Sequence, residues 1–184
     1  MRLTYLNYWL YQAGWFACVL GASRGHPWVG LAFAVALTGV HLALSRERVV
    51  EIRLVLVTVA VGVLVEFIQI TSGTYRFPSG TIVEGLAPLW LLAMWGQFAT
   101  TFRYSMRRVM TRPIRAALFG AAGGPVAFLA GARLGAVTLL PPVAHGLVRL
   151  SVAWTIALCA LSAVARHELP DNAPAPRYRG DDRR

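Results

Sequence analysis

Residues 54–71 read LVLVTVAVGVLVEFIQIT, an apolar run that contains one charged residue, Glu66. The run is about as long as an α-helix that crosses a bilayer. Comparable runs occupy residues 4–22, 28–45, 86–102, 116–132 and 147–165. None of them shows the strict alternation of apolar and polar residues that is typical of membrane barrel strands. The sequence therefore predicts an all-α integral membrane bundle of about six transmembrane helices.

The composition of the chain agrees with lipid as its surroundings. Of its 184 residues, 57% are hydrophobic and 14% are charged, which is more apolar surface than a soluble core can bury. We expect one transmembrane domain over residues 1–169. The tail, residues 170–184, is rich in proline and charge, and we expect it to be disordered.

The arginines predict how the chain is oriented. All eighteen basic residues are arginine, and a six-span chain with a cytoplasmic N-terminus places only Arg24, Arg76, Arg133 and Arg149 outside. The positive-inside rule then puts both termini in the cytoplasm. The net charge of +10 follows from this distribution. No basic patch is interleaved with exposed aromatic residues, so the bilayer is the expected partner and nucleic acid is not.

Glu66 is the candidate catalytic residue, because a carboxyl group inside a span is costly and indicates function by default. Thr58, Gly62, Glu66 and Gln69 follow the three- and four-residue steps of one helix face. That face must look into the bundle, since lipid would disfavour the carboxyl group. The alternative is that Glu66 only joins two helices through hydrogen bonds, with Gln69 or Arg76 as its partner.

Several residues are expected near the depth of Glu66, toward the outer surface. These candidates for substrate binding are Gln69, Trp90, Trp15, Tyr75 and Arg76. Gln69 would orient Glu66, while Trp90 and Trp15 would form an apolar wall. Tyr75 and the nearby Phe77 either anchor their loop at the membrane interface or form part of a lid over a cavity.

A second polar level is expected near the inner surface. It gathers Asn7, His41 and Gln97 from three different spans, as an inner polar cluster or as simple hydrogen bonds between helices. His41 lies about half a membrane from Glu66, so no direct pair is expected. The arginine-rich residues 103–115 either form a short helix in the headgroup region or only anchor the topology.

The fifth run carries a ladder of small residues. Gly120, Gly124, Gly131 and Gly135 let helix backbones approach closely, within the chain or in a helix-mediated oligomer. The two cysteines have no metal-ligand spacing, and we expect neither a metal nor a cofactor.

Three stretches carry a resemblance to a known family. They are NYWLYQAGWFACVLGA (7–22), APLWLLAMWGQFATTFRYSMR (87–107) and LFGAAGGPVAFLAGARLGAV (118–137). Over residues 5–140 the chain resembles an uncharacterised bacterial inner-membrane family, a domain of unknown function, some of whose members carry a zinc-ribbon label. The resemblance implies a multi-pass protein of the bacterial inner membrane and no particular activity. The chain has no CxxC pairs, which argues against zinc.

A fainter resemblance concerns the surroundings of Glu66. Together with Gly73, Tyr75, Phe77 and Trp90, it is similar to the arrangement in membrane carotenoid hydratases and isoprenoid cyclases. There a buried acid is thought to protonate an alkene. The leading hypothesis is therefore a protein that binds or modifies an apolar fatty-acyl or isoprenoid lipid, with Glu66 as general acid. A proton- or cation-coupled transporter or channel subunit and a non-catalytic scaffold are the alternatives, and whether the protein is an enzyme stays open.

Overall fold

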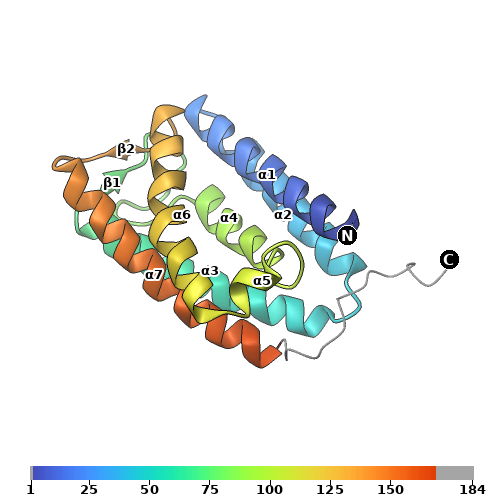
Figure 1. Cartoon of the computed structure of the whole chain (residues 1–184). Helices are drawn as coiled ribbons and strands as arrows, with labels where there is room; N and C mark the ends of the chain where they lie inside the picture. The colour runs from blue at the N-terminus through green and yellow to red at the C-terminus, as the bar shows by residue number, and fades with distance from the viewer. Residues whose placement is uncertain (1, 169–184) are drawn as a thin grey trace.

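Helices dominate the part of the chain that the structure describes, residues 2–168 (Figure 1). In this computed structural model they are α1 (Arg2–Ser23), α2 (Pro27–Leu44), α3 (Arg48–Thr71), α4 (Leu89–Ala99), α5 (Arg107–Met110), α6 (Pro113–Arg133) and α7 (Val143–Glu168). Two short strands, β1 (Tyr75–Arg76) and β2 (Thr138–Leu139), pair in antiparallel orientation at one end of the bundle. The predicted all-α class is confirmed. The tail that was expected to be disordered, residues 170–184, lies outside the described residues.

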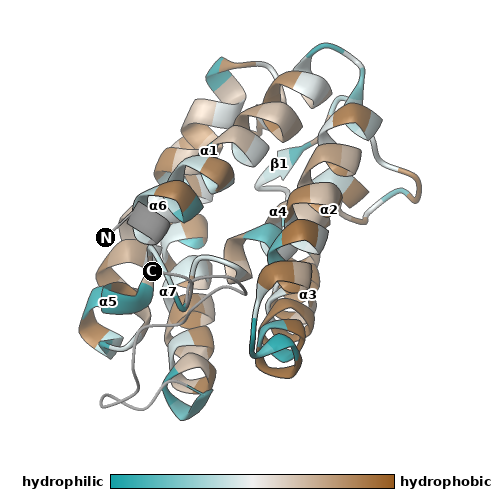
Figure 2. Ribbon diagram, turned by 90° about the vertical axis from the view of Figure 1, so that its right-hand side faces the viewer, coloured by the Kyte–Doolittle hydropathy of each residue, from teal (hydrophilic) through white to brown (hydrophobic). Residues whose placement is uncertain are grey.

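The long helices have the character of membrane helices. α2, α3, α6 and α7 are long and apolar enough to cross a bilayer. Large hydrophobic side chains point outward from them, such as Leu56 on α3 and Ile156 on α7, which are 64% and 65% exposed. Figure 2 shows hydrophobic residues along the helices and hydrophilic residues mainly at helix ends and in loops. Soluble proteins rarely expose so much contiguous apolar surface.

The helices form two hairpins around a central pair. α1 packs along α2, and α6 packs along α7, while α3 and α4 lie between the two hairpins (Figure 1). α4 contacts α1, α2 and α3, and most of its side chains are buried. α3, which carries Glu66, belongs to the central pair and also packs against α7.

The fourth predicted span is shorter than expected. Instead of residues 86–102, α4 covers only Leu89–Ala99, which is about 16 Å at 1.5 Å per residue and about half of the hydrocarbon thickness. Pro88 precedes the helix. Thr100 and Thr101 end it, because their hydroxyl groups donate to carbonyl oxygens three residues earlier and tight turns follow. These turns are tolerated because they are buried in protein.

The arginine-rich residues 103–115 contain a short helix, and its place in the headgroup region remains a prediction. α5 has only four residues, and Pro113 then begins α6. Met110 is fully buried, and its carbonyl oxygen accepts a 2.7 Å hydrogen bond from the hydroxyl group of Ser162 on α7. The segment therefore packs onto the ends of α6 and α7.

The glycines of α6 serve packing inside the chain. A Cβ atom on Gly120 would lie 2.5 Å from the carbonyl oxygen of Trp154 on α7, and one on Gly124 would lie 2.4 Å from the Trp154 indole. Gly131 is also buried, whereas Gly135 lies beyond the end of the helix and is exposed. Association of copies through these glycines remains a prediction.

Gly120→Ala is expected to destabilise the protein by about 1–3 kcal/mol, the usual cost of overpacking. The added methyl group meets backbone atoms of α7, which cannot rotate away. Thermal unfolding of the purified protein in detergent measures the effect. Gly39→Ala on α2 is the matched control, because nothing lies within 4 Å of its Cβ position. Equal unfolding temperatures for the two variants would contradict close packing of α6 on α7.

The loop after α3 turns back into the bundle. Tyr75 is 1% exposed, so the expectation that it anchors the loop at the membrane interface is wrong. Phe77 packs edge-on against Tyr75, with ring centroids 5.3 Å apart. The pairing of Tyr75 in β1 with Leu139 in β2 fixes the position of this loop, because it joins the loop after α3 to the loop after α6.

Candidate functional site

Glu66 lies fully buried on α3 and uses both carboxyl oxygens. The Tyr75 hydroxyl group donates a hydrogen bond to Oε2, and the Trp95 indole N–H donates one to Oε1 at 3.0 Å. Two donors from different segments thus meet one carboxyl group. Buried polar groups are paired in this way because an unpaired one would be costly.

Backbone geometry brings Tyr75 to Glu66. α3 ends at Thr71, and Gly73 has φ +68°, the left-handed conformation that suits glycine after a helix. The chain then reverses, and Tyr75 stacks on Phe128 of α6 with ring centroids 4.4 Å apart. Burial raises the pKa of the Tyr75 hydroxyl group. Tyr75 therefore keeps its proton and can donate to Glu66.

Trp95 reaches Glu66 because α3 has a glycine one turn earlier. A Cβ atom on Gly62 would lie 2.5 Å from Cγ of the Trp95 indole, so the indole lies directly on the α3 backbone. Its other neighbour is Trp154 of α7, with ring centroids 4.7 Å apart. Sequence reasoning missed Trp95. The signal in the sequence that could have indicated Trp95 was that Gly62 lies one turn before Glu66 on the same helix face.

An apolar cavity adjoins this group. It measures about 60 Å³ and is lined by residues of α1, α4, α6 and α7 and by the loops at the strand end. Eight of its fifteen lining residues are aromatic. The predicted wall residues Trp15 and Trp90 both line it, as does Trp95. Glu66 is not in the lining and lies behind Trp95.

Two other expected partners lie elsewhere. The Gln69 side chain accepts a 2.7 Å hydrogen bond from the Thr74 hydroxyl group and donates one of 3.1 Å to the Arg149 carbonyl oxygen. Arg76 is exposed. The expectation that Gln69 orients Glu66, or that Arg76 pairs with it, therefore fails, because Tyr75 and Trp95 occupy both carboxyl oxygens.

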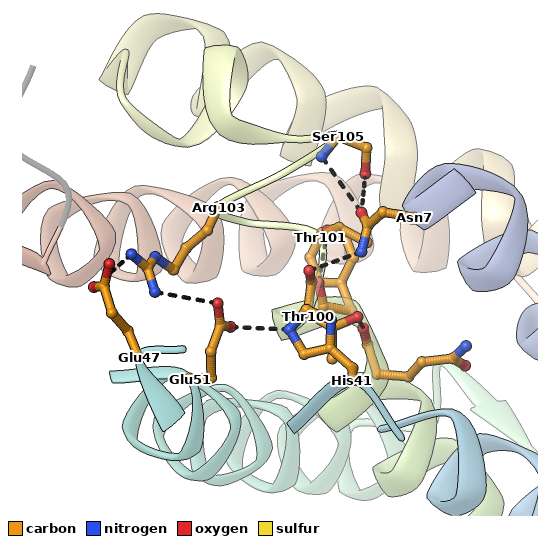
Figure 3. Close-up of polar contacts among 10 residues, drawn as sticks. Asn7, His41, Glu47, Glu51, Thr100, Thr101, Arg103 and Ser105 are labelled. Carbon is orange, nitrogen blue, oxygen red and sulfur yellow. Dashed lines mark hydrogen bonds and ion pairs between the residues drawn. The ribbon is translucent and has the colours of Figure 1, made fainter. Parts of the chain in front are cut away.

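The expected inner polar residues lie toward the other end of the bundle, in two separate sets of contacts. The Asn7 side chain donates to the Thr100 carbonyl oxygen at 3.0 Å and accepts from the Ser105 hydroxyl group at 2.7 Å (Figure 3). Gln97 donates instead to the Leu10 carbonyl oxygen of α1 at 3.1 Å. Asn7 and Gln97 thus tie α1 to α4 and the turns that follow.

His41 belongs to a cluster of charged residues that the sequence reasoning missed. His41 Nε2 lies 3.2 Å from Oε2 of Glu51, and Arg103 Nη1 lies 3.3 Å from Oε1 of the same carboxyl group (Figure 3). Arg103 also bonds Glu47 at 2.7 Å. Glu51 and Arg103 are 0% and 4% exposed. Glu47 is 55% exposed, whereas His41, Glu51 and Arg103 are buried. We call these four residues the buried charge cluster after its three buried members.

The two acids of α3 share a helix face. Glu51, Thr58, Gly62 and Glu66 are all buried and follow steps of seven, four and four residues. Fifteen residues separate the two carboxyl groups, about 22 Å along the axis. His41 therefore pairs with Glu51 and, as expected, not with Glu66.

Within residues 2–168, no three histidine, cysteine or acidic side chains gather as a metal site would require. Cys18 is buried, and its thiol donates to the Gly30 carbonyl oxygen at 3.4 Å. The polar groups of the site thus engage one another and the backbone.

Comparison with known proteins gives one match. Residues 4–160 match the family model described as Protein of unknown function (DUF2878), in agreement with the expected uncharacterised family. No curated protein and no solved structure matches the chain.

Proposed function

Since the chain belongs to this family of unknown function, we propose its role from the site: it binds an apolar fatty-acyl or isoprenoid lipid and modifies it with Glu66 as general acid. One observation carries the proposal. A fully buried carboxyl group, bonded at both oxygens, stands behind a cavity with predominantly aromatic walls.

The position of the cavity supports a lipid ligand. Tyr11 and Trp15 of α1 face Ala127 and Phe128 of α6 across it, and α1 and α6 are not among the helix pairs that pack extensively. A lipid would enter sideways between these two helices from the bilayer. The cavity volume of about 60 Å³ holds about two water molecules, so a lipid enters only if wall side chains move apart.

The surroundings of the acid support proton transfer to a carbon–carbon double bond. In such a step the carboxyl O–H bond breaks, the π electron pair takes the proton, and a cationic carbon forms. The faces of aromatic rings stabilise cations, and Trp90 and Trp95 line the cavity. Trp95 must swing aside for Glu66 to reach the ligand. The likeness to carotenoid hydratases and isoprenoid cyclases adds support.

The proposed setting is the bacterial inner membrane, with six spans and both termini in the cytoplasm. The buried charge cluster would then lie at the cytoplasmic end, and the β1–β2 pair at the outer end. The arginine distribution supports this orientation. α4 would cross the centre of the bundle as a short helix continued by buried turns.

Ligand binding is tested with the tryptophans of the cavity. A brominated unsaturated fatty acid should quench the fluorescence of the purified protein and saturate. Ala127→Phe, which fills the cavity, should weaken binding about tenfold or more, because methylene groups lose their buried site. Ala122→Phe is the matched control, since Ala122 lies exposed on the same helix. Quenching that is equal in all three proteins would contradict a lipid site in this cavity.

A proton- or cation-coupled carrier is the second candidate. It is favoured by the buried charge cluster, which adds a second buried acid, Glu51, to the α3 face of Glu66. A carrier predicts flux driven by a pH gradient, lost in Glu66→Gln, with unchanged lipid composition. The scaffold hypothesis has less support, since Gly120 and Gly124 already pack against α7.

A further inference from the structure

A second, larger hollow lies between α3 and α7. This α3–α7 groove measures about 500 Å³ and runs from Val61 and Ala160 to Ser72 and Arg149. Along α3 that is eleven residues, about 16 Å and close to half of the hydrocarbon thickness. The groove shares no lining residue with the aromatic cavity. It is therefore a separate site and independent of Glu66.

The polarity of the groove changes along its length. Ten of its thirteen lining residues are apolar, among them Val61, Ile156 and Ala160. The three polar residues, Gln69, Ser72 and Arg149, lie together at the end nearest the strands. No acidic side chain lines the groove. A molecule that fits must have a long apolar part and a negatively charged end.

Arg149 is held at that end with donor capacity to spare. Its Nη1 donates to the Ser72 carbonyl oxygen at 2.6 Å, and its own carbonyl oxygen accepts from Gln69 at 3.1 Å. Its Nε is buried and has no partner among the described residues. Guanidinium groups bind phosphate through several N–H donors at once.

We propose that the α3–α7 groove binds an anionic phospholipid of the bilayer, with the phosphate on Arg149 and one acyl chain along the groove. The positive end and the apolar length fit the two parts of such a lipid. The groove volume lies within the range of small-molecule sites, about 300–1,000 Å³. Its length matches one leaflet, so the phosphate would lie at headgroup depth.

Native mass spectrometry of the full chain in detergent tests the proposal. Phosphatidylglycerol and phosphatidylcholine with identical acyl chains are added separately, and the wild type should retain phosphatidylglycerol more strongly. Arg149→Gln should lower this preference about tenfold, the effect of losing a charge-assisted hydrogen bond. Arg133→Gln is the matched control, because Arg133 is exposed at the end of α6, outside the groove. Equal retention of both lipids by the wild type, or an unchanged preference in Arg149→Gln, would overturn the proposal.

Arg149 also donates a hydrogen bond to Ser72, so Arg149→Gln could lower lipid binding through a folding defect. A second variant therefore tests the groove without changing Arg149. Ala160→Trp fills the opposite end of the groove at an exposed position and leaves Arg149 intact. This variant should weaken the binding of long-chain phosphatidylglycerol and leave the binding of the short-chain form unchanged. Unchanged binding of the long-chain form would overturn the placement of the acyl chain. Stronger retention of a free fatty acid than of phosphatidylglycerol would overturn the choice of a phospholipid.

Discussion

Arg103→Gln is expected to destabilise the folded protein by about 3–5 kcal/mol, the cost of leaving a buried charge without its partner. Glu51 is 0% exposed, and Arg103 lies 3.3 Å from it while also bonding Glu47. Without the guanidinium group, the buried Glu51 carboxyl group keeps its contact with His41 Nε2 but loses its arginine partner. Thermal and denaturant unfolding in detergent measure the effect.

An exposed ion pair provides the control for Arg103. Arg53 bonds Glu168 at 2.5 Å, but its side chain is 58% exposed, so Arg53→Gln should cost about 0–1 kcal/mol. Glu51→Gln combined with Arg103→Gln should recover part of the stability, because the buried negative charge is removed together with its partner. If Arg103→Gln unfolds at the same temperature as Arg53→Gln, the buried charge cluster does not stabilise the fold.

Glu66→Gln is expected to leave the fold intact and to lower the rate of lipid modification about 10²–10⁴-fold, the usual contribution of a general acid. The amide oxygen can still accept from Trp95, and the amide nitrogen can donate to the Tyr75 oxygen. Both contacts can thus form, with the Tyr75 hydrogen bond reversed in direction, while the transferable proton is lost. The rate is measured with purified protein in vesicles of an unsaturated lipid, by mass spectrometry of the products over time.

The control for this prediction is the stability of the same variant. Glu66→Gln should insert and unfold like the wild type. A variant that fails to insert would show that Glu66 clamps helices and that any loss of activity is secondary. A variant that inserts normally and modifies lipid at the wild-type rate would remove Glu66 from the chemistry.

Hydrophobicity predicted the helices well and their ends poorly. The run 54–71 begins after Arg53, whereas α3 begins at Arg48. Charged residues were therefore assigned to loops as topology signals, although Glu51 is buried within the first turn of α3. A run of high hydropathy indicates the part of a helix that contacts lipid. A helix can extend beyond that run where its end is buried in protein and its charged residues are paired.

Part of the arrangement around Glu66 could be predicted, because period and depth can be read from a single helix. They placed Glu66 on an inward face and put Trp90 near its level. Trp90 and the other predicted wall residue, Trp15, both line the cavity. Trp95 could not be assigned to Glu66, since its contact depends on how α4 is rotated against α3. The prediction for Tyr75 was wrong because its return into the bundle depends on the pairing of β1 with β2. These two strands are far apart in the sequence.

The most direct measurement compares total lipid extracts by mass spectrometry from three strains. One strain lacks the protein, and the other two are restored with the wild type or with Glu66→Gln at matched membrane abundance. The account predicts an apolar lipid whose mass changes in the absence of the protein and is restored by the wild type alone. Identical extracts from all three strains would contradict a lipid-modifying role for Glu66.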